Sequence, residues 1–199
     1  MNKFISFAAC AIVAASCAHK PAATWSEYES VLIFDSDSLM KVLVIDDPAD
    51  SLFLRDKSID LTTADIDSDI YRKLSKLMLA TVVHEDGVGI AGPQVGIGRR
   101  IVAVQRFDKD GEPFEVYPNI RITAFRGDKE PGGEGCLSVP GWRGTVSRYR
   151  DIDIAYTSPL TLHDTTETVQ GFSAVIFQHE TDHLDGVIYI DRADTLMRR

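Results

Sequence analysis

The chain has 199 residues, 44% hydrophobic and 26% charged, which fits one folded domain and excludes a mostly disordered chain. Its 30 acidic and 21 basic side chains give a formal charge of −9, and because such a surface repels phosphate backbones, direct nucleic-acid binding is not expected. Its three cysteines cannot form a dense disulfide framework, and the absence of a run of about 18 apolar residues argues against a permanent transmembrane helix.

The first 17 residues are typical of a targeting segment. Lys3 precedes an apolar stretch, residues 4–15, that is too short to span a bilayer but suits the core of a signal peptide. Small residues then precede Cys17, and this arrangement resembles a bacterial lipoprotein signal, in which the cysteine is lipidated. Plain cleavage after Ser16 and a buried N-terminal helix are the alternatives. We expect a signal peptide at 1–16, a lipid on Cys17, and an exported, membrane-anchored protein, or a cytoplasmic protein if the signal is not used.

A linker is expected at 17–39, followed by one folded domain at 40–199. Pro21 and neighbouring alanines are typical of a linker. The stretch from Trp25 to Ser38 is ambiguous, because its apolar run at 31–34 fits either a strand or a tether that packs on the domain.

Two helices enclose the predicted strands of the domain. Apolar residues recur at helical spacing through 65–83, with Thr63 or Asp65 as the expected cap, and a second helix is predicted at 172–184, ended by Gly186. Short strands are predicted at 101–105, 114–117, 120–125, 146–148, 152–156 and 166–170. Strands placed between two helices without regular alternation predict an α+β fold rather than a doubly wound parallel sheet.

The second helix carries the pattern H-E-x-x-H. Residues four apart lie on one helix face, so the imidazoles of His179 and His183 can bind one metal ion. Glu180 can then reach a water molecule as general base. The alternative is a polar helix face with two incidental histidines.

A catalytic site of this kind requires a third protein ligand. The third histidine of a metzincin would stand at position 189, which is Tyr189, and no glutamate follows Glu180. Cys136 is the upstream candidate, because a thiolate is a strong ligand for Zn²⁺ or Fe²⁺. A small buried cysteine is the alternative for this residue. Three downstream aspartates without motif support stay open as ligands: Asp185, Asp191 and Asp194.

The glycine-rich segment at 87–96 lacks the lysine of a phosphate-binding loop. It suits an open backbone edge that pairs with an extended peptide, with Gln94 as a neutral hydrogen-bond donor. A plain glycine turn is the alternative.

Together, these segments resemble the peptide deformylase family, whose motifs are GφGφAAPQ, EGCLS and QHExDH. This chain has GVGIAGPQ at 87–94, EGCLS at 134–138 and QHETDH at 178–183, and the resemblance covers roughly residues 40–195. It departs at Gly92, which replaces an alanine, and at residues 47–55, which form a longer connection than in the family.

The resemblance implies antiparallel β-sheets packed around a C-terminal metal-binding helix. It implies one divalent metal ion, Fe²⁺ in the cell with Zn²⁺ or Ni²⁺ as replacements, held by Cys136, His179 and His183. Glu180 would be the general base, and the Gln94 side chain and the Leu137 N–H would hold the developing oxyanion. The residues implied in substrate binding are Val88, Gly89, Gly135, Phe172, Val175 and Ile176, and those implied in supporting the site are Glu134 and Arg143.

The implied reaction removes the formyl group from N-formylmethionyl peptides or nascent proteins, a step of N-terminal processing in protein biosynthesis. A monomer is expected, touching a membrane only through a lipid on Cys17. Export conflicts with action on nascent chains, so the physiological substrate stays open. The alternatives are a small metallopeptidase or amidase that uses the same helix, and an exported, non-catalytic peptide-binding relative. The intact ligands and base disfavour the non-catalytic alternative.

Overall fold

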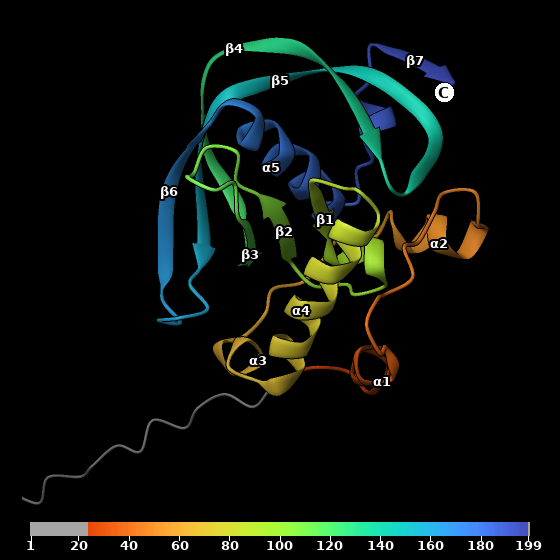
Figure 1. Ribbon diagram of the computed structural model, residues 1–199, viewed down its shortest axis with the longest axis vertical. Helices are drawn as coiled ribbons and strands as arrows, with labels where there is room; N and C mark the ends of the chain where they lie inside the picture. Colours follow the sequence, from red (N-terminus) through yellow and green to blue (C-terminus); the bar gives the residue numbers. More distant parts are fainter. Residues whose placement is uncertain (1–23, 199) are drawn as a thin grey trace, which may run out of the picture.

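The computed structural model describes residues 24–198, in which two antiparallel sheets enclose the helix α5 (Gly171–Leu184) (Figure 1). This arrangement confirms the predicted α+β fold. The expected signal peptide and Cys17 lie outside the described residues. Within the described part of the chain, no helix combines the length and apolarity needed to cross a bilayer.

The first sheet lies between two helices. Its strands are β1 (Gly89–Ala91), β2 (Ile101–Gln105) and β3 (Phe114–Pro118), paired in that order, and they lie between α4 (Asp69–His84) and α5. Along β2, Ile101 and Ala103 pack in the same apolar cluster as α4, whereas Val102 and Val104 pack with α5. Burial on both faces explains why β2 is an unbroken apolar run.

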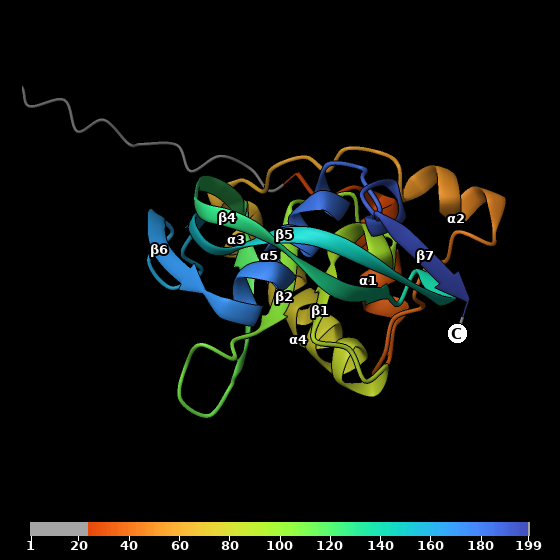
Figure 2. The same cartoon turned by 90° about the horizontal axis from the view of Figure 1, so that it is seen from above.

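The second sheet curves over α5. Its strands are β4 (Arg121–Cys136), β5 (Val139–Thr157) and β6 (Asp164–Gln170), with the short β7 (Thr195–Arg198) paired to β5. Seen from above, β4 and β5 cross over α5 (Figure 2). The strands predicted at 146–148 and 152–156 are one strand, because the ladder with β4 continues across the polar residues between them.

The predicted helix at 65–83 is two helices, so the prediction of one helix was wrong. α3 (Thr63–Ile66) begins after the cap Thr62, whose side chain exchanges hydrogen bonds with Asp65. Ser68 then caps α4 by accepting a hydrogen bond from the Tyr71 N–H. A second capping residue inside an otherwise periodic segment restarts the helix here.

Two further helices lie before α3. α1 (Glu27–Asp35) occupies most of the ambiguous stretch, so its apolar run is helical and not a strand, and Ile33 packs in the cluster of α4. Ser26 and Glu29 form a capping box at its start. α2 (Pro48–Phe53) lies in the longer connection and is capped by Asp47.

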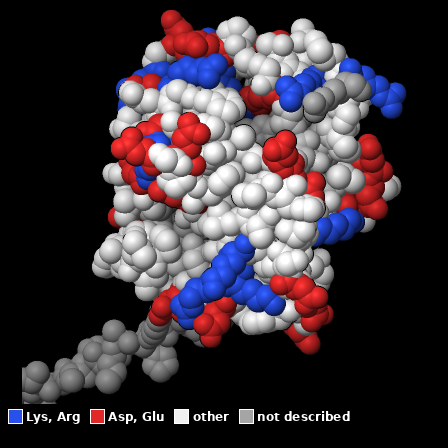
Figure 3. Space-filling model, viewed as in Figure 1, with Lys and Arg blue, Asp and Glu red and all other residues white. Residues whose placement is uncertain are grey.

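Charged side chains on the face shown in Figure 3 form small patches of both signs. The basic patches are separated from one another by acidic and uncharged side chains, and no continuous basic surface is seen on this face.

Candidate metal centre and cleft

The three predicted metal ligands lie together. His179 and His183 stand one turn apart on α5, and Cys136 ends β4, which the curved sheet brings beside the helix. The ligand atoms of these three residues all lie within 4.8 Å of one another, and Cys136 Sγ is 3.2 Å from His183 Nε2. Such a spacing lets one ion contact all three residues, which we call the metal group.

The buried environment of His183 suits a metal ligand. His183 is fully buried, and burial holds its pKa well below the usual range, so its imidazole is neutral, which is the form that binds metals. Its Nδ1 has no hydrogen-bond partner among residues 24–198. The pairing of a thiol with two imidazoles is a ligand set that suits Zn²⁺, and also Fe²⁺ or Ni²⁺.

His179 is oriented by Glu134. The Nδ1 of His179 lies 2.9 Å from Glu134 Oε2, which directs the opposite ring nitrogen toward the metal group. Burial alone would raise the pKa of Glu134, but hydrogen bonds from His179 and Arg148 lower it to about 2. Glu134 is therefore a carboxylate at neutral pH and can only accept these hydrogen bonds.

The arginine that contacts Glu134 is Arg148. Arg148 donates to Glu134 over 2.8 Å and 3.1 Å and to Asp182 over 2.5 Å, and Asp182 also accepts from Arg192. Residues five apart on a strand face opposite sides, so Arg143 lies exposed at the cleft rim while Arg148 is buried. Sequence reasoning missed Arg148, although its two-residue spacing from the buried Val146 in the predicted strand indicated an inward position.

Glu180 is buried beneath β1. Its side chain is next to Gly89, where a Cβ atom would lie only 2.5 Å from Glu180 Oε1. Its other carboxylate oxygen has no hydrogen-bond partner in the described part of the chain, and burial raises its pKa to about 7. A carboxyl group with this pKa can both accept and release a proton near neutral pH.

Gln94 lies in the short 3₁₀ helix η1 (Gly92–Val95), directly after β1. Its Oε1 accepts a hydrogen bond of 2.8 Å from the Ala91 N–H, which fixes the amide so that Nε2 points toward Cys136 Sγ, 3.5 Å away. Leu137 follows Cys136 in the β4–β5 turn and lines the same cleft. The amide group of Gln94 is thus held at the metal group.

A cleft of about 460 Å³ connects these groups. Of the residues implied in substrate binding, all six line it: Val88, Gly89, Gly135, Phe172, Val175 and Ile176. Trp142 lies on its rim, and the ring of Phe107 backs Phe172 at a centroid distance of 5.3 Å. The apolar lining suits a hydrophobic side chain, and the glycines leave backbone accessible to an extended peptide.

Comparison with known proteins agrees with the geometry of this site. A sequence profile described as polypeptide deformylase matches residues 39–199. This chain belongs to the peptide deformylase family. The peptide deformylase of Leptospira biflexa is 36% identical over 163 residues, covering 78% of this chain and 88% of the relative. That of Desulforudis audaxviator is 39% identical over 127 residues, covering 64% and 80%.

Solved structures agree with the family assignment. The crystal structure of peptide deformylase from Thermotoga maritima matches with a TM-score of 0.69 and 31% identity over 80% of this chain and 100% of that one. A class I type b peptide deformylase from Acinetobacter baumannii, with Met-Ala-Ser bound, matches with a TM-score of 0.70 and 30% identity over 79% and 99%. The enzyme class expected from the three motifs is thereby confirmed.

Proposed function

We propose that this protein hydrolyses the formyl amide of N-formylmethionyl peptides or proteins, releasing formate and a free N-terminal methionine. The main observation behind the proposal is that one cleft brings together three metal-binding side chains, the buried carboxyl group of Glu180 and the fixed side-chain amide of Gln94. Membership of the peptide deformylase family supports the same reaction.

Cys136, His179 and His183 would hold one divalent ion, with Fe²⁺ the favoured metal and Zn²⁺ or Ni²⁺ its replacements. When bound, such an ion supplies Lewis acidity, which lowers the pKa of water and polarises a carbonyl oxygen. Glu134 keeps the His179 ring in the orientation that binding requires.

Glu180 is the proposed general base. It takes a proton from the water that attacks the formyl carbon and passes a proton to the amine that leaves. Because Glu180 Oε1 lies where a Cβ atom on Gly89 would point, the carboxyl group packs against β1, the strand along which a peptide would lie. The raised pKa of Glu180, about 7, suits both transfers near neutral pH.

Gln94 and Leu137 are proposed to stabilise the oxyanion. The Gln94 Nε2 and the Leu137 N–H would donate hydrogen bonds to the formyl oxygen as charge develops on it. Because the Ala91 N–H already fixes the Gln94 amide, little reorganisation is needed during the reaction.

The methionine side chain is proposed to bind against Val88, Phe172, Val175 and Ile176. The backbone of the substrate would run between Gly89 and Gly135. In the described sheet β1 pairs with β2 alone, so its second edge is available for an extended peptide.

An anaerobic assay tests this proposal by comparing formyl-Met-Ala-Ser with an internal peptide of similar composition, with metal content measured on the same sample. We expect release of formate from the first and no cleavage of the second. Cleavage of the internal peptide alone would favour the metallopeptidase alternative. Exclusion of air matters because it prevents oxidation of Fe²⁺ and of the Cys136 thiolate.

We also propose that the protein is exported as a lipoprotein anchored through Cys17, on the basis of the signal-like N-terminus, and that it is a monomer. Membrane fractionation of the wild type and of Cys17→Ala tests this location. A soluble cytosolic protein with an intact N-terminus would contradict it.

A further inference from the structure

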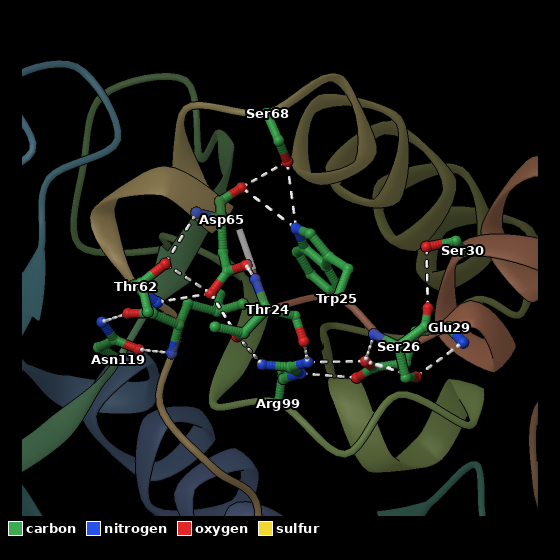
Figure 4. A network of polar contacts seen from close by, with 11 residues as sticks. Thr24, Trp25, Ser26, Glu29, Ser30, Thr62, Asp65, Ser68, Arg99 and Asn119 are labelled. Carbon is green, nitrogen blue, oxygen red and sulfur yellow. Dashed lines mark hydrogen bonds and ion pairs between the residues drawn. The ribbon is translucent and has the colours of Figure 1, made fainter. Parts of the chain in front are cut away.

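The buried guanidinium of Arg99 is held by a segment that precedes the region shared with the family. Arg99 donates to both carboxylate oxygens of Glu29, over 2.6 Å and 2.7 Å, and to the hydroxyl and carbonyl oxygens of Thr24, over 2.9 Å and 2.6 Å. The Trp25 ring also covers the guanidinium, at 5.1 Å from its centroid. Figure 4 shows these side chains converging on Arg99. Since the family profile begins at residue 39, all of these partners belong to the preceding segment.

A second contact fastens the same segment to α3. The fully buried Asp65 accepts hydrogen bonds from the Thr24 N–H and the Thr24 hydroxyl, over 2.5 Å and 2.9 Å, as well as from Thr62 (Figure 4). Thr24 therefore bridges a buried anion and a buried cation. We name the segment 24–35, which includes α1, the N-terminal strap.

The strap covers the outer side of the turn that carries Gln94. Gly96, the residue that ends η1, has a φ of +77°, and a Cβ atom there would lie 3.2 Å from Leu32 Cδ2 and 3.7 Å from Tyr28 Oη. The carbonyl oxygen of Arg99 packs against Gly92, where a Cβ atom would lie only 2.7 Å away. The strap thus packs on the end of η1. It also binds the side chain of Arg99, whose backbone packs on the beginning of η1.

We propose that the N-terminal strap positions Gln94 for catalysis, with Glu29 and Arg99 as positioning residues. This inference rests on the proposed function, because it assigns a purpose to the fixed direction of the Gln94 amide. The strap holds Arg99, Arg99 holds the beginning of η1, and η1 holds Gln94. A displacement of about 1 Å at a catalytic donor can lower a rate about 100-fold, so a rigid support for this turn has a direct effect on turnover.

Glu29→Gln tests the role of the strap. The change keeps the side-chain shape but removes the negative charge that compensates buried Arg99, so the strap is weakened. We expect kcat to fall about 10-fold, less than the ~100–1,000-fold cost of removing an oxyanion donor outright, with KM within twofold and metal content unchanged. Asp60→Asn, which disrupts an exposed pair with Arg121, is the matched control and should turn over like the wild type.

A double-mutant cycle separates positioning from general destabilisation. If the strap acts through Gln94, Glu29→Gln lowers kcat in the wild type but has little further effect in a Gln94→Ala background. The same fold-loss in both backgrounds would overturn the proposal, and so would an unchanged kcat together with a lowered melting temperature. Should Glu29→Gln fail to fold, Thr24→Val serves in its place, because it removes only the hydroxyl contacts with Asp65 and Arg99.

Amide hydrogen exchange provides a readout that does not depend on activity. The Ala91 N–H bonds to Gln94 Oε1, and the Ile97 N–H bonds to the Gly92 carbonyl, so both amides report on η1. We expect both to exchange at least about 10-fold faster in Glu29→Gln than in the wild type or Asp60→Asn. Unchanged exchange rates would overturn the proposal that the strap supports η1. A wild-type protein without deformylase turnover would count against the proposed function alone.

Discussion

Arg148 and Glu134 form an ion pair in which both side chains are at least 93% buried, on adjacent strands that arch over the metal-binding helix. Through Glu134 the pair reaches His179, and through Asp182 it reaches Arg192, so one chain of charges extends from the metal group to the surface. Because each buried charge has an opposite partner, the group can hold His179 in one orientation.

Arg148→Met removes the cation from this chain and leaves Glu134 buried without its main ionic partner. We expect a loss of about 3–5 kcal/mol in the free energy of unfolding and a 10–100-fold weaker metal affinity. Urea denaturation and competitive metal titration measure the two effects. The exposed Arg143→Met should change neither by much, and equal effects of the two substitutions would show that Arg148 has no special role.

Gly89→Ala tests how closely β1 approaches the proposed base. The added methyl group would lie 2.5 Å from Glu180 Oε1 and 2.7 Å from Ile176 Cγ2, so the strand or Glu180 has to move. We expect kcat/KM to fall at least about 10-fold with metal content retained. Gly98→Ala is the control, because its nearest neighbour would be Phe53 Cζ at 3.9 Å. Wild-type turnover in Gly89→Ala would mean that the peptide and the base do not need this close approach.

Stability should decrease below about pH 4 because of Asp65. Burial alone would raise its pKa, but hydrogen bonds from Thr24 and Thr62 lower it below the ordinary value. A carboxyl group with a lowered folded-state pKa stabilises the fold above its unfolded-state pKa of about 3.9, and this contribution is lost as pH falls through the folded-state pKa. Melting temperatures measured from pH 7 to pH 3 should therefore decline below about pH 4, and less steeply in Asp65→Asn. Identical slopes would exclude Asp65 as a source of the decline.

Metal removal should lower stability as well as activity. An ion that binds only the folded chain stabilises it by about 2.7 kcal/mol at 100 times its dissociation constant. Chelation should therefore lower the melting temperature of the wild type and leave that of Cys136→Ser nearly unchanged. A chelator that affected both proteins equally would indicate that Cys136 is not a ligand.

The metal group could be predicted because its chemistry is local in the sequence. The four-residue spacing of His179 and His183 places both on one helix face whatever the rest of the fold does. The unbroken apolar run of β2 similarly follows from its burial on both faces. Cys136 could be linked to the histidines only through the missing third ligand and the family resemblance, because nothing in the local sequence shows that β4 ends beside α5.

Contacts between distant residues could not be predicted in this way. Thr24 and Arg99 are 75 residues apart and Glu134 and Arg148 are 14 apart, so their pairing depends on tertiary packing. The strap was ambiguous for a related reason, since its apolar residues lack a clear period and its helix is stabilised by a capping box and by packing on α4. The single helix predicted at 65–83 was interrupted by a cap that periodicity alone does not reveal.

Glu180 is the residue on which the proposed chemistry depends most directly. The decisive measurement is the anaerobic deformylation of formyl-Met-Ala-Ser by Glu180→Ala, with metal content determined on the same sample as the wild type. We expect the variant to retain about one equivalent of metal and to lose at least about 100-fold in kcat, because the ligands are intact and the general base is absent. Normal turnover by a metal-loaded Glu180→Ala would contradict the assignment of Glu180 as the base.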